Sequence, residues 1–85
     1  MKMPVYSYRD NKVGFMSPMI DQNDDSAIRG FSYAINNREG IMGFSPADFD
    51  LYQIGVFDSD TGIIESTSAG SPLLIVSGTS VVNVK

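Results

Sequence analysis

The segment "FDLYQIGVFDSDTGIIE", residues 49–65, carries the clearest structural pattern in the chain. Its apolar side chains alternate, and an extended strand would present them on two opposite faces: Tyr52, Ile54 and Val56 on one, Leu51 and Phe57 on the other. A strand with two apolar faces needs cover on both sides, which only the interior of a sheet provides. This segment therefore predicts a central β-strand.

The strand runs into Asp58-Ser59-Asp60-Thr61-Gly62, a series of turn-forming residues. The D-x-D-x-G spacing is similar to the start of a calcium loop, but Gly62 stands at the third acidic position and Glu65 comes too early for the bidentate glutamate. Asp58 and Asp60 could also act as a carboxylate pair in acid–base chemistry, although turn carboxylates are usually solvated. The sequence favours a hairpin turn in which Asp58 caps the local backbone and Gly62 is left-handed.

Residues 23–37 change to a helical period. Apolar residues recur three and four positions apart and form one stripe: Ile28, Phe31 and Ile35, with Ala27 and Ala34 beside them. Asn23 or Asp24 can cap the start, and Asn36-Asn37 can end the helix in a left-handed turn. Gly30 costs about 1 kcal/mol against alanine, which indicates close packing or a tolerated weakness. Arg29 is expected to form a surface ion pair with Asp25, one turn earlier.

The flanking segments predict further short elements. Residues 4–20 read as a β-hairpin that turns at Asp10-Asn11-Lys12, and residues 45–48, "SPAD", read as a single helical turn with proline at its first position. The C-terminal residues begin as a Ser/Thr/Gly linker and continue into "LLIV" and "SVVNV", which are β-prone and nearly uncharged. One or both runs should pair with the sheet or with another chain.

Together these elements predict an α+β fold with the order β-β-α-β-β, a four- to five-stranded, largely antiparallel sheet with one helix packed on a face. Residues 1–65 would form the single domain, and residues 66–85 a linker and a β-prone tail, either an added strand or a dimer arm. One helix cannot cover both apolar faces of the sheet. We therefore expect a homodimer that buries the second face or the "PLLIVSG" strand.

Composition removes most catalytic chemistries. The 85 residues include no cysteine and no histidine, so a Ser-His-Asp or Cys-His centre cannot form and zinc would need carboxylates alone. No Gly-rich phosphate loop follows a strand into a helix. We expect no enzyme activity, no cofactor and no metal. No apolar run approaches the ~18 residues of a membrane span, so we also expect no membrane partner.

The charge distribution is uneven. The formal net charge of −4 predicts repulsion from phosphate backbones. Residues 1–20 nevertheless hold Lys2, Arg9 and Lys12 against Asp10 alone, a local charge of +2. Tyrosines and a phenylalanine alternate with these cations, which is the composition of a stacking surface for single-stranded DNA. The candidate DNA-binding residues are Lys2, Tyr6, Tyr8, Arg9 and Lys12. The alternative is a solvated hairpin whose aromatic side chains fill the core, and composition alone favours it.

Three stretches resemble a known family: "VYSYRDNKVGFMSPM", "DDSAIRGFSYAINN" and "SPADFDLYQIGVFDSDTG". They are similar to the small nonstructural protein of the gokushoviruses (Microviridae), phages with circular single-stranded DNA genomes. The resemblance spans about residues 4–65 and fades after Glu65. It implies a role in genome replication in the host bacterial cytoplasm, as a candidate single-stranded DNA-binding protein, and it carries no catalytic or base-reading residue set.

The resemblance and the acidic charge point in different directions. We expect a nonstructural phage protein that acts in single-stranded DNA replication and binds that DNA; a dimer would double Lys2, Arg9 and Lys12 to six cations. A first alternative is a protein-interaction factor that recruits or inhibits a host or phage replication protein without touching DNA. A second is a minor scaffold or virion component.

Overall fold

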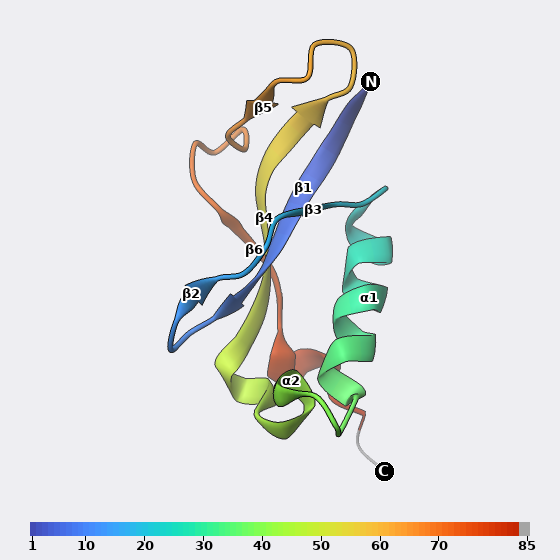
Figure 1. Ribbon diagram of the computed structural model, residues 1–85, viewed down its shortest axis with the longest axis vertical. Coiled ribbons are helices and arrows are strands. Elements are labelled where there is room, and N and C mark those ends of the chain that lie inside the picture. The colour runs from blue at the N-terminus through green and yellow to red at the C-terminus, as the bar shows by residue number, and fades with distance from the viewer. Residues whose placement is uncertain (84–85) are drawn as a thin grey trace.

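The computed structural model of the protein describes residues 1–83. Its elements are, in order, β1 (Lys2–Asp10), β2 (Gly14–Phe15), β3 (Met19–Ile20), α1 (Asp24–Asn36), α2 (Ile41–Phe44), η1 (Pro46–Asp48), β4 (Phe49–Asp58), β5 (Ile64–Glu65), β6 (Leu73–Ser77) and η2 (Gly78–Val81), where η marks a 3₁₀-helix (Figure 1). The fold is α+β, with an antiparallel sheet and one main helix, as the sequence predicted. No helix in the described part of the chain is long and apolar enough to cross a membrane.

The sheet is built around β1 and β4, which pair antiparallel along their whole lengths. Strands β2 and β3 both pair with the free edge of β1, and β5 and β6 both pair with the free edge of β4. The sheet therefore has six strands but is only four strands wide. The sequence predicted four to five strands, and the additional one arises because the return arm of the first hairpin is divided into β2 and β3. The central position predicted for the strand of residues 49–58 is confirmed.

Both predicted hairpins form. Of the two β-prone runs in the C-terminal segment, only the first forms a strand in the described residues. The first hairpin turns after Asp10, and the second closes with Asp58 N donating to Ile63 O at 2.9 Å. The run "LLIV" lies in β6 and pairs with β4. The run "SVVNV" forms no strand in the described residues, because Ser80 and Val81 belong to η2 and Val82-Asn83 is irregular; its last residue lies outside them.

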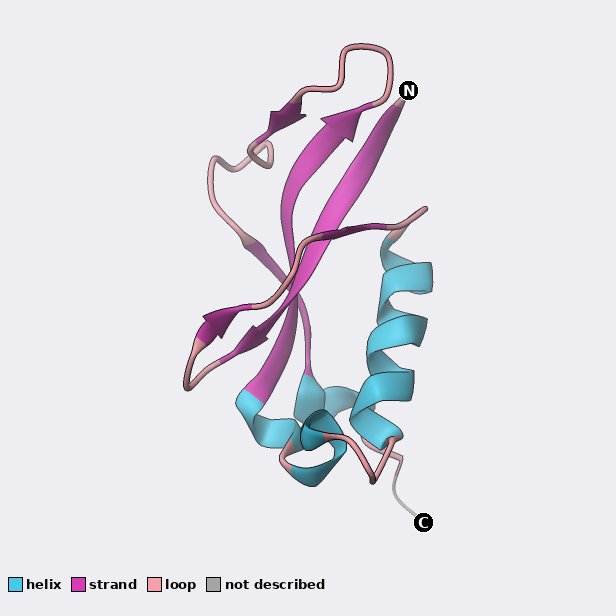
Figure 2. Cartoon of the chain, viewed as in Figure 1, coloured by secondary structure: helices cyan, strands magenta, loops and turns pink. Residues whose placement is uncertain are grey.

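Helix α1 covers one face of the sheet, which places the core between them (Figure 2). Phe31 is fully buried and Ile35 is 2% exposed, and both belong to the same buried cluster as Leu51 of β4. The sheet also contributes Tyr6 and Phe49 to this core. Burial of each large apolar side chain stabilises the fold by about 1.5–3 kcal/mol, so the predicted apolar stripe is what attaches the helix.

The ends of α1 confirm one prediction and correct another. Asn23 is the N-cap, because its side chain accepts a hydrogen bond from Ser26 N at 2.9 Å. The predicted left-handed turn at Asn36-Asn37 is wrong: the helix runs through Asn36, and Asn37 has φ −83° and an extended backbone. The side chain of Asn36 instead forms hydrogen bonds with the C-terminal segment. Local capping signals could not predict these bonds, because the partners are distant in sequence.

Two further expectations about α1 are settled by geometry. Arg29 and Asp25 do not form the predicted ion pair, although the structure describes both residues. At Gly30 an added Cβ would meet only the Tyr8 hydroxyl, at 3.8 Å, which is an ordinary van der Waals distance. Gly30 is therefore a tolerated weakness rather than a site of forced close packing.

Candidate nucleic-acid interface

The sheet face opposite α1 carries a small group of aromatic and cationic side chains. Leu51 is fully buried under α1, so the alternation of β4 turns the next residue, Tyr52, to the outer face. The ring centroids of Phe15 and Tyr52 lie 5.3 Å apart, in an edge-to-face arrangement. The Arg9 guanidinium carbon lies 5.1 Å from the centroid of the Phe15 ring. Arg9, Phe15 and Tyr52 are called the outer cluster below.

The outer cluster comes from three strands that the sheet brings side by side. Arg9 of β1 is opposite Phe15 of β2, and Ser7 of β1 is opposite Tyr52 of β4. Phe15 remains 43% exposed, and its ring is supported by the cation–π contact and the aromatic contact. The cluster therefore offers solvent an aromatic surface with a cation next to it, held on a rigid sheet.

Acidic side chains stand close to these cations. Asp50 is the residue opposite Arg9 on β4, and its carboxylate accepts a hydrogen bond from Asn11 Nδ2 at 3.0 Å. Lys12 Nζ, at the hairpin tip, lies 4.0 Å from Asp48 Oδ2. Arg9 and Lys12 thus each have a carboxylate nearby, Asp50 and Asp48 respectively. The arrangement favours stacking over charge as the source of any affinity for nucleic acid.

The structure separates the five residues that the sequence predicted for DNA binding. Tyr6 is fully buried, and its hydroxyl donates to Asp24 Oδ1 at 2.5 Å, so its ring offers no surface for stacking. Tyr8 packs its ring against Phe31, with centroids 5.2 Å apart. Lys2 lies at the far end of β1, opposite Asp58. Arg9 and Lys12 are the two that share the hairpin end.

Burial and nearby charge change the acid–base properties of three groups. Desolvation raises the pKa of Tyr6, and the hydrogen bond to Asp24 raises it further. Desolvation is also the main cause that raises the pKa of Tyr8. A hydrogen bond with Ser26 is the main cause that lowers the pKa of Asp21. These three groups lie where β1 and β3 meet the start of α1.

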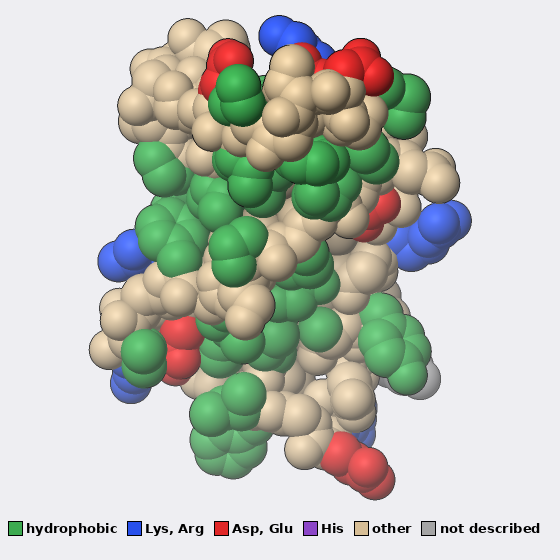
Figure 3. All heavy atoms as spheres, turned by 45° about the horizontal axis from the view of Figure 1, so that its top comes forward, with side chains coloured by type: hydrophobic (Ala, Val, Ile, Leu, Met, Phe, Trp, Pro, Cys, Tyr) green, Lys and Arg blue, Asp and Glu red, His purple; other side chains and the backbone are tan. Residues whose placement is uncertain are grey.

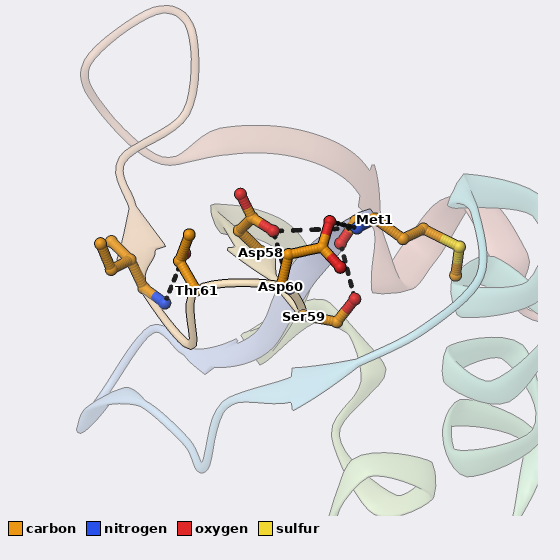
Figure 4. Close-up of polar contacts among 6 residues, drawn as sticks. Met1, Asp58, Ser59, Asp60 and Thr61 are labelled. Atoms are coloured by element: carbon orange, nitrogen blue, oxygen red, sulfur yellow. Dashed lines mark hydrogen bonds and ion pairs between the residues drawn. The ribbon is translucent and has the colours of Figure 1, made fainter.

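The acidic turn is a hairpin turn, as the sequence favoured. Asp58 Oδ1 accepts a hydrogen bond from Asp60 N at 2.9 Å, and Gly62 has φ +76°. The amino group of Met1 lies 2.7 Å from Asp60 Oδ2, and Ser59 donates through its backbone and its hydroxyl to Met1 O (Figure 4). The two carboxylates therefore hold the turn and the amino group of Met1, the residue before β1. Within residues 1–83, no three His, Cys, Asp or Glu side chains converge as a metal site requires.

Comparison with known proteins places this chain in a family. Searches of the curated proteins and of the solved structures give no significant match. The family model described as "Phage ORF5 protein" matches residues 3–81. That match runs from β1 through η2, so it includes the C-terminal strand as well as the central pair and the helix. The chain is a phage protein and belongs to the phage ORF5 protein family.

Proposed function

We propose that this phage protein acts in replication of a single-stranded DNA genome, in the cytoplasm of the host bacterium, by binding the single strand directly. The observation that carries the proposal is the outer cluster, in which an exposed Phe15 ring lies between Arg9 and Tyr52 on a sheet face without a helix. Exposed aromatic rings on a sheet, next to cations, are a recurring means of holding unpaired bases. The resemblance to the gokushovirus nonstructural protein agrees with this activity.

The proposed affinity comes mainly from stacking. Each base that stacks on an aromatic side chain contributes about 1–3 kcal/mol, whereas the net charge of −4 repels phosphate at long range. Arg9 and Lys12 would each contact a phosphate, in competition with Asp50 and Asp48. A homodimer, which we also propose, would present two outer clusters and double the cations that face one strand.

The test uses fluorescence anisotropy of a labelled oligonucleotide of about 30 nucleotides, with the duplex as a control. Phe15→Ala should weaken single-strand binding by about 5- to 150-fold, the equivalent of one lost stacking contact. Ile64→Ala is the control, since Ile64 is a 63% exposed apolar residue on β5, and it pairs with Phe57 at the other end of β4 from Asp50, the residue opposite Arg9. Equal affinities of the two variants would remove the outer cluster as the binding surface.

A second candidate function is supported by the exposed apolar side chains. Ile63 and Ile64 are 53% and 63% exposed beside the acidic turn, an arrangement that suits a basic and apolar protein partner. Figure 3 shows hydrophobic side chains gathered over much of one face, with most charged side chains toward its margins. In this case the protein would recruit or inhibit a replication protein without contacting DNA. Absence of oligonucleotide binding, together with cross-linking to a replication protein that Ile64→Asp abolishes, would favour it.

A further inference from the structure

The C-terminal segment passes beside the end of α1 (Figure 1). A groove lies between the two segments. Its volume is about 530 Å³, within the range of sites that hold small ligands. Arg29 and Tyr33 line one wall from α1, and Ser80, Val82 and Asn83 line the other. None of the described residues that line it is acidic, in contrast to the surroundings of the outer cluster.

Asn36 builds this groove by joining its two walls. The Nδ2 group of Asn36 donates to Ser32 O at 2.7 Å and to Val81 O at 2.9 Å, and its Oδ1 accepts from Asn83 N at 2.8 Å. One part-buried amide thus holds a segment 45 to 47 residues away in sequence against the helix. The wall formed by Val82 and Asn83 is therefore fixed by specific bonds, and the groove is a defined feature of the fold.

Arg29 and Tyr33, the cationic and the aromatic side chain of the groove, lie on one face of α1. Arg29 and Tyr33 are four residues apart on α1, so their side chains lie one turn from each other. Tyr33 is 78% exposed, and it takes no part in the core. Arg29 forms no ion pair with a described residue; its charge contributes only a minor part of the lowered pKa of Asp21. The groove thus combines an available guanidinium with an available aromatic ring.

We propose that this groove is a second binding site for single-stranded DNA, which takes one nucleotide with its phosphate on Arg29 and its base stacked on Tyr33. The inference rests on the proposed function and adds a site on the opposite side of the sheet from the outer cluster. A neighbouring pocket of about 470 Å³ shares Asn36, Val82 and Asn83 with the groove; it is also lined by Arg38 and by no acidic described residue. The next phosphate along the strand would lie near Arg38.

The experiment measures anisotropy of a fluorescein-labelled oligothymidylate of about 30 nucleotides with the full chain and its variants. Tyr33→Ala should weaken binding on the order of tenfold, and Tyr33→Phe should keep it, since the phenyl ring still stacks. Arg29→Gln should weaken binding and reduce its salt dependence by about 0.7 in the slope of log K against log salt. Far-ultraviolet circular dichroism checks that each variant keeps its fold.

The outcomes separate this inference from the proposed function. If the wild-type chain binds and Phe15→Ala weakens binding while Tyr33→Ala does not, the DNA-binding function stands and the groove proposal is overturned. If Tyr33→Ala loses affinity and Tyr33→Phe retains it, the groove proposal is supported. If the wild-type chain binds no oligonucleotide, the DNA-binding function and the groove proposal are both overturned. A titration with 5′-dTMP followed by NMR gives an independent readout: the side-chain amide signals of Asn36 should shift, and unchanged signals would count against the site.

Discussion

Tyr6→Phe should lower the free energy of unfolding by about 1–2 kcal/mol at neutral pH. The substitution keeps the buried ring and removes only the hydroxyl, which donates to Asp24 Oδ1 at 2.5 Å and so ties β1 to the start of α1. A hydrogen bond to a charged acceptor contributes about 1.5–3 kcal/mol. Asp24 is exposed and regains water when the hydroxyl is lost, which places the expected loss close to the lower end of that range.

The same substitution should change the response to alkaline pH. The pKa of Tyr6 is raised in the folded chain, by desolvation first and then by the bond to Asp24. The unfolded chain therefore releases this proton near pH 10, before the folded chain does. The stability that Tyr6 contributes is fully present below about pH 10 and is lost as the pH rises above it. Tyr6→Phe removes this part of the loss, and Tyr8, whose pKa is also raised, keeps a smaller part.

Urea denaturation followed by circular dichroism tests both statements. With a slope of about 1 kcal/mol per molar urea for a chain of this size, the unfolding midpoint should fall by about 1–2 M. Tyr33→Phe is the matched control, because Tyr33 is 78% exposed and its hydroxyl has no hydrogen-bond partner among the described residues. Equal midpoints for the two variants at pH 7, or the same loss of stability between pH 9 and pH 11 as in the wild type, would refute the assigned bond.

Three further substitutions test the packing by their unfolding midpoints. Gly30→Ala should stabilise the protein by about 0.5–1 kcal/mol, because helix propensity improves and the new Cβ meets no close neighbour; a loss of stability would contradict the geometry. Gly78→Ala should cost about 3 kcal/mol, the upper end for overpacking, because its Cβ would overlap the carbonyl oxygen of Pro46; a cost below 1 kcal/mol would argue against this close approach. Phe31→Ala should cost about 3–5 kcal/mol, while Phe44→Ala stays within about 0.5 kcal/mol; similar costs would show that the core is misplaced.

The central strand and the helix could be predicted because their signals are local. The alternation from Leu51 to Phe57 and the stripe that includes Phe31 each lie within one element, and burial follows directly from the pattern. Tyr6 and Tyr8 are two residues apart, so a strand places both on one face of β1. It could not show which face the helix covers, and that choice makes both tyrosines part of the packed side.

The outer cluster and the groove both depend on contacts between segments that are distant in sequence. Tyr52 was recognised as a strand residue, and its alternation with Leu51 was the signal that could have marked it as surface, once the covered face was known. The bonds of Asn36 to Val81 and Asn83 cross 45 and 47 residues, and no local pattern encodes them. Those bonds hold one wall of the groove against α1, so sequence reasoning had no means to find it.

The central claim is that the protein binds single-stranded DNA mainly by stacking, and the most direct test is anisotropy of the labelled single strand at several salt concentrations. Contacts with two or three phosphates predict a slope of about −1.4 to −2.1 in log K against log salt, with binding that persists at physiological salt and exceeds binding to the duplex. No binding at low salt, or equal binding to single strand and duplex, would contradict the claim.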